Sequence, residues 1–155
     1  RVEKQTQYAA DGTTVKSTFD YTRDKNGKIT KKSVDSNGDG KADSSYSYKR
    51  DIFGRLTQKT YDKDNDGKAD KTTDYTRDKF GRITKKVEKE GAKTTTTDIK
   101  YGEDGATTTT VTLSDGSKTE TSLSKNGEKT ITKKDKNGKV ISTVKYDKDG
   151  KKVTT

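Results

Sequence analysis

Two short acidic loops hold the side chains of this chain that are best suited to chemistry. The second loop follows the pattern Asp-x-Asp-x-Asp-Gly-x-x-Asp, in which the acidic positions are Asp62, Asp64, Asp66 and Asp70. The first loop repeats this spacing with Asn at its third position, and its members are Asp35, Asn37, Asp39 and Asp43. Calcium prefers six to eight hard oxygen ligands, and alternating acidic residues around a sharp glycine turn supply them. The spacing therefore predicts one Ca²⁺ ion in each loop.

The remaining ligands of each predicted site come from the backbone. At the seventh position of the loops, the carbonyl groups of Lys41 and Lys68 would join the acidic ligands. An EF-hand loop has a bidentate Glu at its twelfth position, where this chain has Tyr46 or Thr73. We therefore expect weak calcium binding with a structural role, and Mg²⁺ fits less well because it keeps more water. The alternative is that both loops are simple polar turns.

The loops recur because the central part of the chain is repeated. The segment Tyr21–Thr30 has the form Tyr-x-Arg-Asp-x-x-Gly, followed by a basic residue, an aliphatic residue and Thr. It returns at Tyr48–Thr57 and at Tyr75–Thr84, with a constant offset of 27 residues. A fixed period indicates one supersecondary unit that is copied along an array.

Turn signals divide the chain into short segments of similar length. Twelve glycines, most of them preceded by Asp, Asn or Phe, are separated by 10 to 15 residues. Each interval holds one strand and its turn, and leaves no room for an amphipathic helix. The sequence therefore predicts an all-β fold: an elongated antiparallel β-meander of about a dozen strands, largely a single-layer sheet, built from double-hairpin repeats of 27 residues.

Alternation along the expected strands places the motif tyrosines and arginines on one face. If Gly27 closes a three-residue loop in a left-handed conformation, Arg23 lies opposite Ile29, on the face that also carries Tyr21. The other copies should follow the same arrangement. The result is a ladder of aromatic, aliphatic and arginine side chains. Its candidate binding residues are Tyr21, Arg23, Tyr48, Arg50, Tyr75, Arg77 and Tyr101.

Composition limits what the chain can bury. Leu, Ile, Val and Phe make up about 13% of the residues, below the roughly 20% under which a highly charged chain is usually disordered. Disorder is the alternative to a repeat array, but the constant spacing of the copies and the β-forming residues between turns favour order. So small an apolar content excludes a conventional two-layer core.

The formal net charge of +10 comes mainly from lysines that are spread along the whole chain. Dispersed lysine keeps exposed strands soluble and prevents edge-to-edge pairing, and a polyanionic partner is the alternative explanation. The chain has no Cys or His, which excludes thiolate and imidazole sites, and no apolar run is long enough to span a membrane. Because its acidic residues lie on turns and no nucleophile motif is present, we expect no enzymatic activity.

We expect one continuous repeat array over residues 1–155. Residues 1–20 form a partial repeat, residues 21–100 form three repeats with two acidic loops, and residues 101–155 form shorter hairpin repeats. In the third repeat, Glu88-Lys89-Glu90-Gly91 replaces the acidic loop. The chain opens without Met and without an apolar signal segment, and we expect it to be part of a longer secreted protein.

The repeated motif resembles the YD repeat of Rhs-type bacterial surface and toxin-shell proteins and of teneurins. The resemblance is clearest at Tyr48–Thr57 and extends over residues 19–100. It departs from the family form at Arg23-Asp24, Arg50-Asp51 and Arg77-Asp78, where the family usually has Tyr-Asp. The Lys/Thr-rich C-terminal part looks more like bacterial lipoproteins with a free-standing single-layer sheet. The resemblance implies a bacterial cell-surface or extracellular location and no catalysis.

Two functions remain open from the sequence. The first is a non-enzymatic structural or adhesive β-repeat segment, stiffened by Ca²⁺ in both acidic loops, whose partner is a host or bacterial surface glycan or protein. The second is a basic binding module for an anionic polymer, such as cell-wall glycopolymer, lipopolysaccharide or nucleic acid, with binding that weakens steeply with salt. Nucleic acid is the partner we expect least. The sequence makes no prediction about the oligomeric state.

Overall fold

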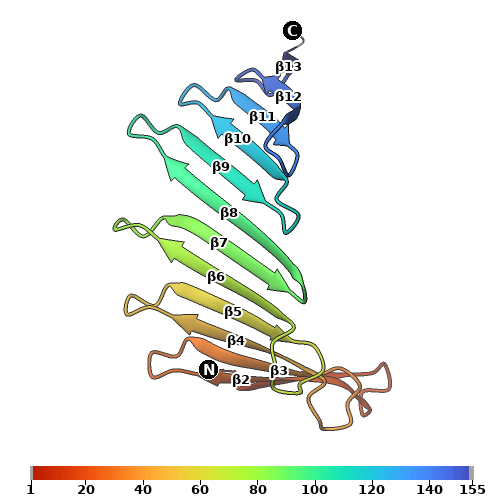
Figure 1. The fold of residues 1–155 in the computed structure, drawn as a ribbon. Helices are drawn as coiled ribbons and strands as arrows, with labels where there is room; N and C mark the ends of the chain where they lie inside the picture. Colours follow the sequence, from red (N-terminus) through yellow and green to blue (C-terminus); the bar gives the residue numbers. More distant parts are fainter. Residues whose placement is uncertain (1, 154–155) are drawn as a thin grey trace. The chain divides into compact units, whose positions relative to one another are not determined.

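The computed structural model describes residues 2–153, which form thirteen β-strands and no helix. The strands lie in one open antiparallel sheet in chain order (Figure 1), so the expected all-β meander is confirmed. The strands are β1 (Lys4–Tyr8), β2 (Val15–Arg23), β3 (Ile29–Asp35), β4 (Ser44–Arg50), β5 (Leu56–Asp62), β6 (Lys71–Arg77), β7 (Ile83–Glu90), β8 (Lys93–Tyr101), β9 (Thr107–Thr112), β10 (Lys118–Leu123), β11 (Lys129–Lys134), β12 (Val140–Tyr146) and β13 (Lys152–Val153).

Hairpin turns of one backbone design recur along the sheet, and in five of them the first residue is an aspartate whose carboxylate binds the turn. At Asp24 the backbone N–H donates to the carbonyl of Lys28 (2.9 Å), and the N–H of Gly27 donates to the carbonyl of Asp24 (2.8 Å). Oδ1 of Asp24 also accepts the N–H groups of Asn26 and Lys28, both at 2.9 Å. The same carboxylate contacts recur at Asp51, Asp78, Asp135 and Asp147. The twelve turn glycines expected from the sequence all have positive φ.

The pairing register agrees with the register expected from the turns. Arg23 pairs with Ile29 after an irregularity between Thr22 and Arg23, and Arg50 pairs with Leu56 in the next copy. The left-handed glycine of each turn allows one strand to carry an extra residue, which is a β-bulge. This prediction is confirmed for the first two copies.

No hydrophobic side chain in residues 2–153 is buried. The buried residues are polar or charged, and they are Ser17, Thr18, Asp35, Ser45, Asp62 and Thr73. Large apolar side chains at turn tips are exposed, as at Ile52 (94%) and Phe53 (71%). Backbone hydrogen bonds and cross-strand side-chain pairs therefore hold the sheet together, since residues 2–153 form no second layer and no core.

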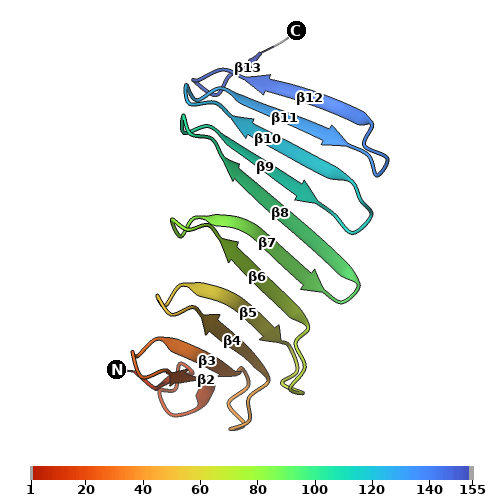
Figure 2. The ribbon, with the colours of Figure 1, turned by 60° about the vertical axis from the view of Figure 1, so that its left-hand side comes forward.

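The chain divides into two compact units, one up to Asp74 and one from Tyr75 onwards. The first unit contains β1 to β5 and the beginning of β6, and its two acidic loops connect β3 to β4 and β5 to β6. In the second unit, strands β7 to β13 follow one another as neighbours (Figure 2). Gly91 and Ala92 form a tight turn between β7 and β8, where the other copies have an acidic loop.

Candidate functional site

The loop of residues 62–70, between β5 and β6, is built around a buried carboxylate. Asp62 is the last residue of β5 and is only 8% exposed. Its Oδ2 accepts the N–H of Gly67 at 3.0 Å. Its Oδ1 is buried and has no hydrogen-bond partner within residues 2–153. A buried carboxylate oxygen is costly unless a donor or a cation satisfies it.

Two further carboxylates of this loop approach Asp62. Oxygen atoms of Asp62, Asp64 and Asp70 all lie within 4.8 Å of one another. Two ligand atoms that each lie about 2.4 Å from the same Ca²⁺ ion are at most about 4.8 Å apart, so this spacing fits a shared ion. Asp70 also accepts the N–H of Lys63 at 2.7 Å. The structure thus gathers three of the four acidic residues that the sequence assigns to this loop.

The fourth acidic residue, Asp66, lies outside this group. Its Oδ1 accepts the N–H of Lys68 at 2.7 Å, and its Oδ2 lies 3.9 Å from the ammonium nitrogen of Lys68. Both residues are exposed. Asp66 therefore stabilises the turn through the backbone of Lys68. The sequence assigns it to the metal site, but the structure leaves it outside the three-carboxylate group.

The loop of residues 35–43, between β3 and β4, has a different hydrogen-bonding pattern. Asp35 ends β3 and is 6% exposed. Its Oδ1 accepts the N–H of Gly38 at 2.7 Å, and its Oδ2 accepts the N–H of Gly40 at 2.9 Å. Among the residues that the structure describes, the acidic side chains of this loop form no group of three. The loop therefore satisfies its central carboxylate with its own N–H groups.

The remaining predicted ligands of this loop also bond within the loop. Asn37 Oδ1 accepts the N–H of Asp39 at 2.9 Å, and Asp39 Oδ1 accepts the N–H of Lys41 at 2.8 Å. Oδ2 of Asp43 accepts the hydroxyl of Ser36 at 2.5 Å and the N–H of Ser36 at 2.7 Å. These two hydrogen bonds, the hydroxyl first, lower the pKa of the Asp43 carboxyl.

The two loops also differ at the residue that precedes the third acidic position. Gly38 has a φ of 76°, and a Cβ atom added there would lie 2.2 Å from the carbonyl oxygen of Val15. The first loop therefore packs directly on the backbone at the start of β2. The equivalent residue of the second loop is Asn65, which adopts the left-handed conformation with a φ of 55°.

Arginines of the repeated motif are engaged with their own turns. Arg23 Nη1 donates to the carbonyl of Gly27 at 3.0 Å, and Arg77 Nη1 donates to that of Gly81 at 3.0 Å. In the second copy, the ammonium of Lys28 donates to the carbonyl of Gly54 at 3.0 Å. These contacts give Arg23 and Arg77 a structural role at the turns, and Lys28 takes that role in the second copy.

The register places Tyr21 and Tyr48 on the same face of the sheet. Tyr21 pairs with Lys32, and Lys32 pairs with Tyr46, which lies two residues before Tyr48 in β4. Both tyrosines are half-buried. Burial raises the pKa of the Tyr48 hydroxyl, and the nearby Tyr46 adds to the effect. Tyr75, in β6, is also half-buried.

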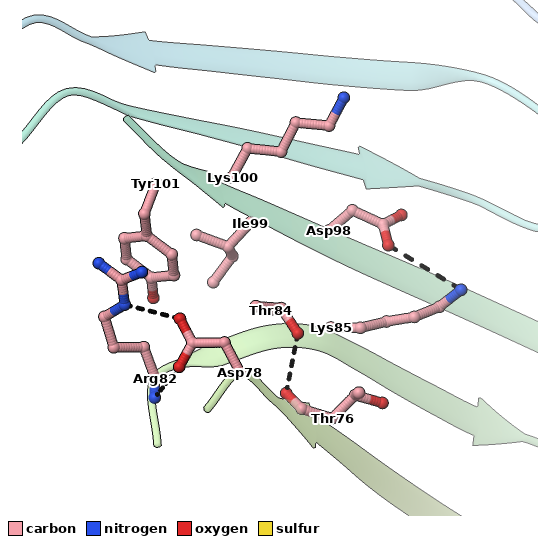
Figure 3. Close-up of a pocket in the computed structure, with 9 residues that line it drawn as sticks. All are labelled: Thr76, Asp78, Arg82, Thr84, Lys85, Asp98, Ile99, Lys100 and Tyr101. Carbon is pink, nitrogen blue, oxygen red and sulfur yellow. Dashed lines mark hydrogen bonds and ion pairs between the residues drawn. The ribbon is translucent and has the colours of Figure 1, made fainter. Parts of the chain in front are cut away.

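Tyr101 lies in a shallow hollow of the second unit (Figure 3). Its hydroxyl donates to the carbonyl of Ile83 at 3.0 Å, and the guanidinium carbon of Arg82 lies 4.3 Å from its ring centroid. The pairing of β7 with β8 runs only as far as Lys85 and Asp98. The tyrosine side chain therefore fills space that strand pairing leaves open. The hollow is lined by Thr76, Asp78, Arg82, Thr84, Lys85, Asp98, Ile99, Lys100 and Tyr101.

Ion pairs balance much of the charge in this hollow. Arg82 Nε lies 2.7 Å from Asp78 Oδ2, and the ammonium of Lys85 lies 3.9 Å from Asp98 Oδ1 (Figure 3). Burial raises the pKa of Asp78, but the hydrogen bonds from Arg82 outweigh it, and the pKa lies below its ordinary value. Tyr101, which the sequence assigns to the candidate binding ladder, thus packs against Arg82.

Sequence reasoning missed the side chains that accompany the motif tyrosines. The rings of Tyr46 and Tyr61 stack with centroids 4.7 Å apart and an interplanar angle of 25°. The ammonium of Lys32 lies 4.5 Å from the Phe19 ring centroid, and that of Lys59 lies 4.9 Å from the Tyr46 ring centroid. A signal was present, because Lys59 follows Lys32 at the repeat offset of 27 residues.

No family model matches this sequence, and no curated protein matches it. Among solved structures, the fold is similar to a mutant form of the Tc holotoxin pore of Photorhabdus luminescens, with a TM-score of 0.32 and 15% identity. The match covers 96% of this chain and 10% of that chain, so this chain spans about a tenth of its length. A likeness at this TM-score carries no conclusion about family or function. No helix within residues 2–153 is long and apolar enough to cross a membrane.

Proposed function

We propose that this chain is a non-enzymatic structural β-repeat segment of a bacterial cell-surface or secreted protein, stiffened by Ca²⁺ in its acidic loops. The observation that carries the proposal is the buried Asp62 carboxylate, whose Oδ1 has no partner within residues 2–153. Carboxylate oxygens of Asp64 and Asp70 lie within 4.8 Å of it. Three carboxylates this close repel one another until a cation neutralises them.

The donor set of the second loop fits calcium. Asp62, Asp64 and Asp70 would hold the ion, and the Lys68 carbonyl is the further oxygen donor that the spacing provides, whereas Asp66 lies outside the group. Asp62 ends β5 and Asp70 directly precedes β6. A cation bound between them would therefore tie the two strands together at the loop that connects them. Its contribution is charge neutralisation and cross-linking, with no catalytic step.

We propose weaker calcium binding in the first loop. Both oxygens of Asp35 already accept backbone N–H groups, and Asp43 accepts two hydrogen bonds from Ser36. A cation would have to compete with these donors. The second loop should therefore be occupied first, and the first loop only at higher calcium concentration.

Metal binding would matter more here than in a protein with a core. A ligand that binds only the folded state stabilises it by about 2.7 kcal/mol when its concentration is one hundred times Kd. The total stability of an ordinary domain is about 5–15 kcal/mol. Since residues 2–153 bury no hydrophobic side chain, this term would be a large share of the stability of the first unit.

The test compares the same substitution at equivalent positions of the two loops. Calorimetric titration and thermal unfolding are measured with calcium and with chelator for the wild type, Asp62→Asn and Asp35→Asn. We expect calcium to raise the Tm of the wild type, the rise to vanish in Asp62→Asn, and most of it to remain in Asp35→Asn. If the wild type shows no binding heat and no calcium-dependent rise, the loops are polar turns and the proposal fails.

A further inference from the structure

The two faces of the sheet in the first unit carry different charges. Directly paired residues share a face, as do residues two apart in a strand, so the register assigns each strand residue to a face. Within residues 4–74, every acidic strand residue lies on one face, and these residues are Asp20, Asp35, Asp62 and Asp74. The opposite face, which we call the aromatic face, carries five cationic strand residues, Arg23, Lys32, Arg50, Lys59 and Lys71.

The aromatic face also collects the rings of three strands, β2, β4 and β5, while β3 contributes Lys32 and Val34 to it. Its aromatic residues are Phe19, Tyr21, Tyr46, Tyr48 and Tyr61, all of them half-buried. One row crosses the sheet from β2 to β5 through Tyr21, Lys32, Tyr46 and Tyr61. These side chains are half-buried by their neighbours in the sheet, and none of them is fully buried, so each leaves part of its surface exposed. The row is therefore accessible to a ligand from solvent.

Two lysines of this face are available to an anionic ligand. Neither Lys32 nor Lys59 makes an ion pair within residues 2–153, and each ammonium lies over an aromatic ring of the face. On the same face, the Nε of Arg50 has no hydrogen-bond partner within the described chain. The aromatic face has no carboxylate among its strand residues to balance this positive charge. On the opposite face, acidic and basic strand residues are equal in number.

We propose that the aromatic face of the first unit binds an acidic polysaccharide whose chain crosses the strands. Neighbouring strands are about 4.8 Å apart, which is close to the length of one pyranose unit. Consecutive sugar rings would then lie over consecutive strands, in contact with Tyr21 on β2, Tyr46 on β4 and Tyr61 on β5. Their carboxylate or sulfate groups would meet Lys32, which lies between Tyr21 and Tyr46 in the row, and Lys59, which pairs with Tyr48 beside the row.

A single-stranded nucleic acid fits this face less well. Bases that stay stacked repeat at about 3.4 Å along a strand, so they would have to unstack from one another to lie over β-strands about 4.8 Å apart. A polymer whose rings follow one another end to end matches the row better. The polysaccharide is therefore the occupant that the geometry favours, and the nucleic acid is tested as its competitor.

This site is independent of the proposed calcium site, because Asp35 and Asp62 lie on the opposite face. Binding of polygalacturonate is therefore measured by calorimetric titration in the presence of chelator. The variant Lys32→Gln/Lys59→Gln removes two charges from the aromatic face. Lys31→Gln/Lys49→Gln removes the same charge from the opposite face and is the matched control. Tyr21→Leu tests the ring while it keeps an apolar side chain, and thermal unfolding checks that each variant is folded.

We expect Lys32→Gln/Lys59→Gln to weaken binding about tenfold, since two exposed charge pairs each contribute a factor of a few. The control pair should change affinity less than twofold, Tyr21→Leu should weaken it severalfold, and added salt should weaken it for the wild type. Neutral dextran should not compete. The proposal is overturned if both lysine pairs lose affinity equally, if polygalacturonate does not bind, or if oligothymidylate binds this face more tightly.

Discussion

The two acidic loops of the first unit share a spacing and a position in the repeat, yet they satisfy their central carboxylate differently. In the loop of residues 35–43, three N–H groups donate to Asp35: those of Asn37 and Gly38 to Oδ1, and that of Gly40 to Oδ2. In the loop of residues 62–70, one N–H group reaches Asp62 and its second oxygen is left without a partner within residues 2–153. Equal spacing of acidic residues therefore does not make equal cation sites. The difference lies in how many backbone donors turn toward the first aspartate.

The largest expected effect is the removal of calcium from the second loop. In wild type, chelator should lower the free energy of unfolding by about 2.7 kcal/mol relative to calcium at one hundred times Kd. Without calcium, Asp62→Asn should be at least as stable as the wild type, because an amide can donate to Asp64 or Asp70 and carries no charge. Thermal unfolding of the wild type and of Asp62→Asn, each with calcium and with chelator, measures these stabilities. If calcium-free Asp62→Asn is much less stable than the calcium-free wild type, the three carboxylates do not destabilise the loop by repelling one another.

The next effect tests how much the contact between Gly38 and the backbone of Val15 contributes to stability. Gly38→Ala should destabilise the protein by about 2 kcal/mol or more, because the added Cβ meets the Val15 carbonyl oxygen at 2.2 Å and φ is positive. Gly40→Ala is the control, with a similar φ of 86° and no atom within 4 Å of the added Cβ. It should cost only about 1 kcal/mol. Denaturant unfolding measures both, and equal losses would show that the contact with Val15 does not hold the loop.

A smaller effect is expected when the first loop receives the missing carboxylate. Asn37→Asp gives it acidic residues at the four positions of the second loop. If backbone donors on Asp35 limit metal binding, the change should raise calcium affinity by at most about tenfold, or about 1.4 kcal/mol. Titration calorimetry of Asn37→Asp in an Asp62→Asn background isolates this loop. Affinity equal to that of the intact second loop would instead identify Asn37 as the deciding residue.

The smallest effect concerns Ser36, whose counterpart in the second loop is Lys63. The Ser36 hydroxyl lowers the folded-state pKa of Asp43, so its stabilising contribution is present above the ordinary pKa of 3.8 and is lost as pH falls through the lowered value. Ser36→Ala should move the pKa of Asp43 back toward 3.8. An NMR titration of the Asp43 carboxyl in the wild type and in Ser36→Ala measures the shift. An unchanged Asp43 would contradict the assigned cause.

Repetition made the fold predictable and hid the difference between the loops. The left-handed Gly27 implied that Arg23 pairs with Ile29, because a hairpin turn of known length determines its register. Which N–H groups point at Asp35 or Asp62 depends on the backbone path around Gly38 and Asn65, and the path around Gly38 depends on contact with Val15 in another strand. Such contacts are not encoded in the spacing of acidic residues.

The absence of buried hydrophobic side chains in residues 2–153 also determines how stability should vary with temperature. The heat capacity of unfolding arises mainly from newly exposed apolar surface, and polar surface reduces it. This chain should therefore fall well below the usual value of about 12–15 cal/mol/K per residue. With a small heat-capacity change, the curve of free energy against temperature becomes shallow and nearly straight. The sheet should lose little stability on cooling, where proteins held by an apolar core begin to weaken.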